Sequence, residues 1–135
     1  MGYTNYWECY TDFTDEEWEA VCNEAQYIKE IDSSYARELD SVDILKGKVI
    51  NEICFNGVGD NGCETFYLNN KATSFSFCKT REMPYDIYVW HLLTFCQMIK
   101  KDFHARRDRW YWDKSRPLPD VYKPQSQVDR SGAVV

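Results

Sequence analysis

Apolar and polar positions follow two different periods along this chain, and these periods predict its elements. Residues 15–31 have the clearest helical period, with Trp18, Val21, Cys22, Ala25 and Ile28 on one face. Just before it, Thr14 and Glu17 have the spacing of a capping box, in which each side chain accepts a hydrogen bond from the other residue's amide. Phe13 and Trp18 occupy the positions of a hydrophobic staple. We therefore predict a helix over 15–31.

A second helical pattern begins at Met83-Pro84-Tyr85, where a proline in the first turn is tolerated. One face carries Tyr85, Val89, Leu92, Cys96, Ile99 and Phe103. The other positions are also largely apolar, at Ile87, Trp90, Phe95 and Met98. A helix that is apolar on nearly all sides is either central in its fold or covered by a partner. The second alternative predicts a homodimer interface within residues 87–98.

Segments rich in aromatic and β-branched residues predict strands at 2–10, 48–55, 63–68, 74–78 and 109–114. Residues 32–46 are polar and turn-like. The resulting order is close to β-α-β-β-α-β and predicts an α+β fold. In it, two helices cover one face of an antiparallel sheet of about four to five strands, as in the split ferredoxin-like plan. Residues 115–135 contain three prolines and no periodicity, which predicts a disordered tail after one domain spanning 1–114.

Composition indicates how the chain can form a core and in which compartment it is expected. With 5 Trp, 10 Tyr and 7 Phe, the chain can form a core without a metal or a disulfide. Residues 1–20 do not resemble a signal peptide, and no long apolar run indicates a membrane span, so we expect a cytoplasmic protein. In that reducing compartment the six cysteines are expected to be unpaired and mostly buried.

Residues 57–62, Gly-Val-Gly-Asp-Asn-Gly, match the glycine pattern G-x-G-x-x-G of dinucleotide-binding loops. Such a loop must open a helix, whereas residues 63–68 alternate like a strand. Asn61-Gly62 is instead a favourable pair for a hairpin turn, because both residues tolerate positive φ. We therefore predict a hairpin loop and no cofactor.

The chain also carries a combination of short motifs at 1–7 (MGYTNYW), 55–66 (FNGVGDNGCETF) and 77–86 (FCKTREMPYD). In this combination, which covers roughly residues 1–100, it resembles a group of small proteins of bacteriophages and of bacterial genomes that carry phage genes. Members of the group typically begin M-G-Y-T-H-Y-W, so Asn5 stands where they have histidine. This departure weakens any proposal that the first strand supplies a catalytic imidazole or a metal ligand. The resemblance implies a phage setting and a host-cell location, but no activity.

Candidate chemistry is confined to polar residues near the ends of predicted elements. They are Asn56, Asp60, Glu64, Lys79, Thr80 and Asp86. Such positions are turn and capping residues in one interpretation, and in the other they line a small pocket for a ligand or nucleotide. With two histidines and no Cys-x-x-Cys, we predict no metal site, and no local pattern marks a cysteine as an activated nucleophile.

Charge is distributed unevenly, with a net −11 over residues 1–64 and +5 over 65–135, which together give −6. Residues 100–116 interleave seven basic residues with aromatic ones, a composition that can contact phosphates and stack on bases. A solvated helix end followed by an edge strand explains the same composition. Because the whole chain is acidic, nucleic acid is a disfavoured partner.

Together these features favour a non-enzymatic, phage-type protein that binds a host protein, such as a component of a defence system. Its interface is expected to include the second helix together with Trp110 and Trp112. The alternative is a ligand-binding or nucleotide-handling protein that uses the glycine loop and the 79–86 loop. Nucleic-acid binding by residues 100–116 is the third hypothesis.

Overall fold

The computed structural model describes residues 3–35, 39–41 and 51–108. In chain order the elements are β1 (Thr4–Cys9), α1 (Asp15–Tyr35), β2 (Leu39–Ser41), β3 (Glu52–Gly57), the short 3-10 helix η1 (Gly59–Asn61), β4 (Phe66–Asn69), β5 (Thr73–Lys79), α2 (Asp86–Ile99) and β6 (Phe103–Arg107). The predicted α+β class is confirmed. The predicted strand at 109–114 and the predicted tail at 115–135 lie outside the described residues.

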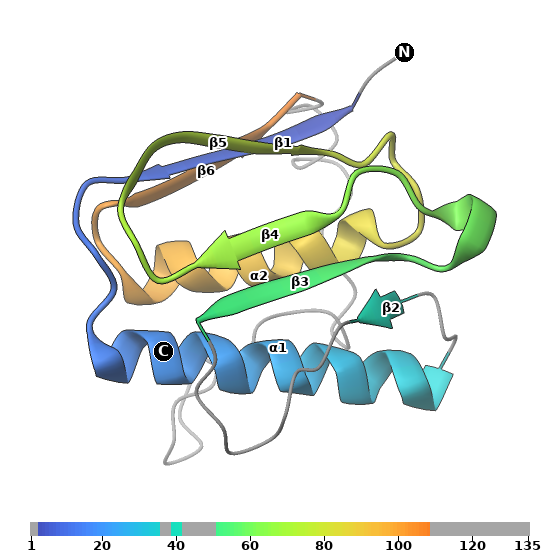
Figure 1. Ribbon diagram of the computed structural model, residues 1–135, viewed down its shortest axis with the longest axis horizontal. Helices are drawn as coiled ribbons and strands as arrows, with labels where there is room; N and C mark the ends of the chain where they lie inside the picture. The colour runs from blue at the N-terminus through green and yellow to red at the C-terminus, as the bar shows by residue number, and fades with distance from the viewer. Residues whose placement is uncertain (1–2, 36–38, 42–50, 109–135) are drawn as a thin grey trace.

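The strands form two antiparallel sheets, with the orders β5-β1-β6 and β2-β3-β4 (Figure 1). The first sheet keeps part of the split plan, because β1 lies between the strand that precedes α2 and the strand that follows it. The plan's single sheet does not form, because β4 and β5 are not paired with each other. The strands β2, β3 and β4 therefore form a separate sheet, of which β3 and β4 lie in front of α2 in Figure 1.

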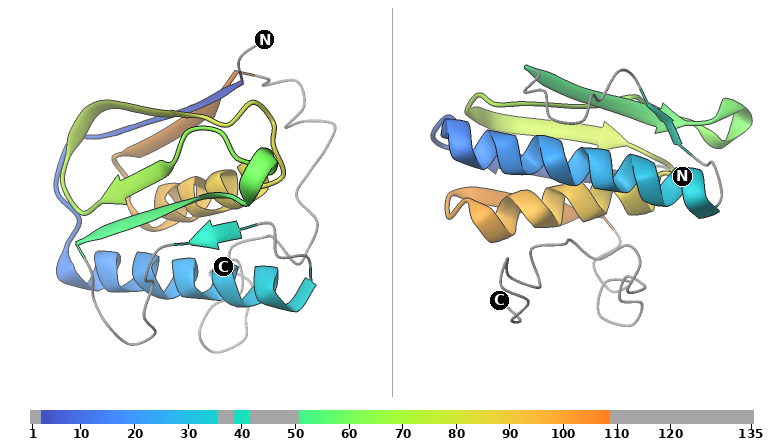
Figure 2. Two further views of the ribbon diagram at one scale, coloured as in Figure 1. Left: turned by 45° about the vertical axis from the view of Figure 1, so that its right-hand side comes forward. Right: turned by 90° about the horizontal axis from the view of Figure 1, so that it is seen from below.

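Helix α2 is the centre of the fold. Most of its residues are buried, among them Val89, His91, Leu92, Phe95 and Cys96, and one side remains partly exposed. Figures 1 and 2 show the sheet β5-β1-β6 above it, β3 and β4 in front of it, and α1 along its other side. Its apolar positions are thus covered largely by the chain's own elements, as the first of the two sequence alternatives predicts.

Helix α1 begins as predicted and ends later than predicted. The Thr14 amide donates to Glu17 Oε1 at 2.8 Å, and the Glu17 amide donates to Thr14 Oγ1 at 3.1 Å, which completes the capping box. The Phe13 and Trp18 rings of the staple are 5.4 Å apart. The helix runs on to Tyr35, so the prediction of turn structure from residue 32 is wrong. It continues because Ile31 and Asp32 are also buried.

The predicted second helix extends too far. It ends at Ile99, because Lys100 has an extended backbone, and Phe103 begins β6 instead of extending the helix face. Lys100 is buried, and its Nζ lies 2.8 Å from the Asp102 carboxylate and 2.6 Å from Thr11 Oγ1. These contacts fasten the start of β6 to the segment after β1. No helix in the described part of the chain is long and apolar enough to cross a membrane.

Candidate functional site

The glycine loop is built by its own backbone and by Asn56. Asn56 Oδ1 accepts from the amides of Gly57 and Cys63 at 2.7 and 3.0 Å, and its Nδ2 donates to the Cys63 carbonyl at 2.9 Å. The loop joins β3 to β4, so the predicted hairpin is confirmed. The left-handed residue is Gly59 and not the predicted Asn61-Gly62 pair, because the loop closes through a 3-10 turn. Asn56 therefore has a structural role, since it holds this loop closed.

Glu64 and Lys79 lie together, as the pocket hypothesis requires, but they are joined mainly through the backbone. The Lys79 amide donates to Glu64 Oε1 at 2.8 Å, and the Glu64 amide donates to the Lys79 carbonyl at 3.1 Å. The Tyr85 hydroxyl donates to the Glu64 carbonyl at 2.5 Å. These bonds fix the loop to the end of β5. Asp60 belongs to η1, where no residue is buried, and none of these bonds includes it.

Thr80 and Asp86 meet in a second cluster, which is buried. Asp86 Oδ1 accepts from Thr80 Oγ1 at 2.6 Å and from Asn5 Nδ2 at 2.7 Å. The other carboxylate oxygen pairs with the guanidinium of Arg107. That guanidinium lies 4.6 Å from the centre of the Trp90 ring. We call Asn5, Thr80, Asp86 and Arg107 the Asp86 cluster.

The Asp86 cluster joins β1, α2, β6 and the turn after β5, so its carboxylate has a structural use. Sequence reasoning missed Asn5 and Arg107 as members. Asp86 in the first helical turn is explained by the helix dipole alone, and spacing did not select Arg107 among seven basic residues at 100–116. The six predicted site residues therefore fall into a turn, a loop junction and a buried ion pair, and a shared pocket among them stays a prediction.

Two further buried polar contacts join the helices. Glu24 Oε2 and His91 Nε2 are 2.7 Å apart, and the Tyr88 hydroxyl donates to Asp32 Oδ1 at 3.0 Å. Across the described residues no group of three or more His, Cys, Asp or Glu side chains could hold a metal ion. Burial raises the pKa of the Cys78 thiol to about 12, with the nearby Glu64 charge adding to the shift, so this thiol is not activated.

The predicted interface on α2 is wrong in part. Phe95 is fully buried, because it packs into the core. Ile87 and Trp90 are half-buried against that core, and Met98 is 42% exposed. Trp110 and Trp112 lie outside the described residues. Ile87, Trp90 and Met98 share the one side of α2 that is not fully buried, so the predicted homodimer interface through them stays a prediction.

Exposed aromatic side chains gather instead on the outer face of the sheet β5-β1-β6. Alternation along β1 turns Asn5, Trp7 and Cys9 toward the core and Tyr6 away from it. Tyr6 is paired with Phe77 of β5 and with Arg106 of β6. Phe75 and Phe77 are each 53% exposed. We call the outer residues Tyr6, Phe75, Phe77, Lys79 and Arg106 the aromatic face.

β5 turns its large apolar side chains toward solvent, whereas a half-buried strand usually turns them toward the core. In Ser74-Phe75-Ser76-Phe77-Cys78 the inward positions include Ser76 and Cys78, while both phenylalanines face outward. Sequence reasoning identified this strand but not the face, because alternation does not say which side meets the helices. A strand whose large apolar side chains point to solvent breaks the pattern that stabilises the fold, and such exceptions are expected at functional surfaces.

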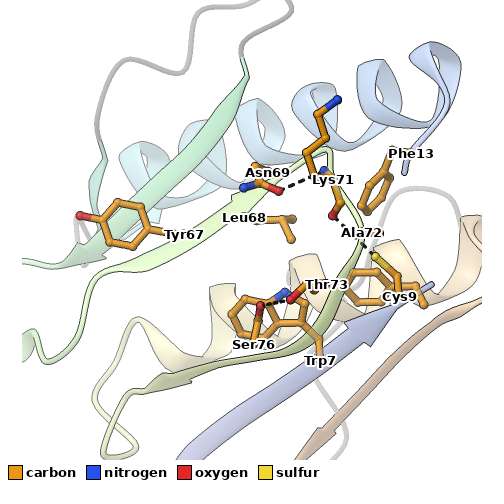
Figure 3. Close-up of a pocket in the computed structure, with 11 residues that line it drawn as sticks. Trp7, Cys9, Phe13, Tyr67, Leu68, Asn69, Lys71, Ala72, Thr73 and Ser76 are labelled. Atoms are coloured by element: carbon orange, nitrogen blue, oxygen red, sulfur yellow. Dashed lines mark hydrogen bonds between the residues drawn. The ribbon is translucent and has the colours of Figure 1, made fainter. Parts of the chain in front are cut away.

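One pocket opens where β4 and β5 separate (Figure 3). Its volume is about 180 Å³, and it is lined by Trp7 and Leu68, with the paired hydroxyls of Thr73 and Ser76 at 2.8 Å. The Lys71 ammonium nearby lies 3.7 Å from the Asp12 carboxylate. Pockets that hold nucleotide-sized ligands typically measure roughly 300–1,000 Å³. This pocket is too small for a nucleotide, and none of the six predicted ligand residues lines it.

Comparison of the chain with protein-family models, with curated proteins and with solved structures finds no match.

Proposed function

We propose that this protein works by binding a host macromolecule without catalysing a reaction, and that the aromatic face is its contact surface. The observation that carries the proposal is the outward orientation of Phe75 and Phe77, each 53% exposed. The phage setting implied by the sequence resemblance supplies the host context. Inhibition of a host defence system is one consequence that such a contact would have.

The exposed rings offer enough surface for a binding contact. A phenylalanine side chain can bury about 150–250 Å², so the two half-exposed rings leave roughly 200 Å² for a partner. At about 25 cal/mol per Å², covering that area contributes roughly 5 kcal/mol before the cost of association is subtracted. The Arg106 guanidinium, 5.2 Å from the centre of the Tyr6 ring, adds a cation beside these rings.

The ligand-binding alternative has weaker support. The side chains of Asn56, Thr80 and Asp86 bond to neighbouring residues of the chain, and a ligand would have to break those bonds. The aromatic face needs no such rearrangement, because its rings are already exposed.

Site-specific photo-crosslinking tests the proposal. A benzophenone amino acid replaces Phe77 in one variant and Tyr67 in another, and each variant is expressed in a bacterial host and irradiated. Tyr67 is a matched control, because it is an aromatic strand residue with 55% exposure on the other sheet. We expect a discrete crosslinked product from position 77 and none from position 67. The same products from both positions, or none from position 77, would refute the proposal.

A further inference from the structure

We infer that the aromatic face binds single-stranded nucleic acid, with two or three bases stacked on Tyr6, Phe75 and Phe77. This inference rests on the proposed function and names the class of its partner. Sheets that bind single-stranded RNA present aromatic side chains on neighbouring strands, and two or three unpaired bases stack on them.

The three aromatic rings of the face lie next to one another. The Tyr6 and Phe75 ring centres are 5.9 Å apart, and those of Phe75 and Phe77 are 5.8 Å apart. Phe77, Tyr6 and Arg106 form one row across the three strands. Phe75 lies next to this row, two residues earlier on β5. Three rings therefore lie side by side on one face of the sheet.

Among the described residues, neither helix covers this face. Both helices lie on the other side of the sheet, below it in Figure 1. β1 is the central strand and is hydrogen-bonded to β5 and β6 along its length, so the rings stand on a paired, rigid support. A platform of this kind loses little conformational entropy when a strand binds, because its rings are held in place before contact.

Two cations border the rings, and each can contact one phosphate of a bound strand. Lys79 lies at the end of β5 and Arg106 lies on β6, so the cations stand on opposite sides of β1. Two carboxylates border the same face. Glu8 accepts from the Tyr10 hydroxyl at 2.5 Å and lies 3.9 Å from Arg106, and Asp108 accepts from the Thr4 amide at 3.0 Å. With two cations against two carboxylates, stacking must supply most of the affinity.

The side chains of the face are of the kinds that a stacked single strand contacts. Its outward positions on β1 and β5 include the buried Thr4 as well as Tyr6, Glu8, Phe75, Phe77 and Lys79, and those on β6 are His104 and Arg106. Aromatic side chains and arginine are also enriched at protein interfaces, so the arrangement of the rings, and not their composition, favours nucleic acid. Bases require only ring faces, and phosphates require only cations.

Fluorescence anisotropy with labelled ten-nucleotide single strands of mixed sequence, both RNA and DNA, tests the inference in low-salt buffer. Loss of one stacked base weakens binding by about 5- to 150-fold. We expect this loss in Phe75→Ser and Phe77→Ser, and wild-type affinity in the matched control Tyr67→Ser. A duplex of the same sequence should bind poorly, because its bases are not available for stacking.

Salt dependence provides a second readout. Two phosphate contacts give a slope of log K against log salt of about −1.4, and Lys79→Ala should reduce its magnitude by about 0.7. Each substitution is on an exposed side chain, so circular dichroism should show an unchanged fold.

The inference is overturned if no single strand binds the wild type, or if Tyr67→Ser weakens binding as much as Phe77→Ser does. If no strand binds but position 77 crosslinks to a protein in cells, the nucleic-acid inference fails and the proposed function stands. If no strand binds and position 77 gives no crosslink, both fail.

Discussion

Removal of the Asp86 carboxylate is the sharpest test of how this fold is held together. In Asp86→Ala the guanidinium of Arg107 stays in the core without its counter-ion, since the two side chains are only 10% and 12% exposed. Asn5 Nδ2 and Thr80 Oγ1 lose their acceptor in the same step. The substitution therefore affects every partner of this carboxylate at once.

Breaking a buried ion pair by removing one partner costs about 3–5 kcal/mol, because the remaining charge is unpaired. The lower limit is already a large part of the roughly 5–15 kcal/mol that stabilises a typical domain. For a domain of about 100 residues, each kcal/mol lowers Tm by about 4–8 °C, so we expect Asp86→Ala to lower it by at least about 12 °C.

Urea unfolding followed by tryptophan fluorescence measures this loss. Arg107→Met keeps an apolar chain beside Trp90 and removes the charge, so the double variant with Asp86→Ala leaves neither charge unpaired. We expect the double variant to be more stable than the sum of the single effects by at least about 1 kcal/mol. Additivity within about 0.5 kcal/mol would show that the pair is not coupled and would refute the reasoning.

An exposed ion pair is the control. Lys71 lies 3.7 Å from Asp12, and the two side chains are 69% and 57% exposed. Lys71→Ala should change the free energy of unfolding by less than about 1 kcal/mol, because water screens such pairs.

Three further predictions concern stability. Gly57→Ala should lower the free energy of unfolding in urea by about 1–3 kcal/mol, because its Cβ would lie 2.3 Å from the Asn61 carbonyl oxygen; an unchanged midpoint would contradict the loop geometry. Thr14→Ala should lower the free energy of unfolding by about 1 kcal/mol through loss of the capping box, and a loss below about 0.5 kcal/mol would contradict that role of Thr14. Hydrogen bonds from Lys100 lower the pKa of Asp102, so its contribution is present above the ordinary carboxyl pKa and is lost as the pH falls. Asp102→Asn should therefore lower Tm more at pH 7 than at pH 2, and an equal loss at both would contradict this sign.

Local sequence determined the elements that local interactions can hold. The capping box at Thr14 and Glu17 fixed the start of α1, and the period of Trp18, Val21 and Ile28 fixed its buried face. These signals act within one or two turns, so they do not depend on the rest of the fold. The end of α1 depended on burial at Ile31 and Asp32, and the sequence pattern did not show that burial.

The candidate site, in contrast, depends on contacts between segments that are distant in the sequence. Nothing within residues 74–78 says which side of that strand meets the helices, and only its pairing with β1 turned Phe75 and Phe77 outward. Asp86 and Arg107 are 21 residues apart, and only the packing of α2 beneath β6 brought them together. Sequence alone thus determined the class of fold, the glycine hairpin and the start of the first helix, because these depend on neighbours along the chain. Tertiary structure decided which side chains are central, which are paired and which are exposed, because these depend on contacts between distant segments.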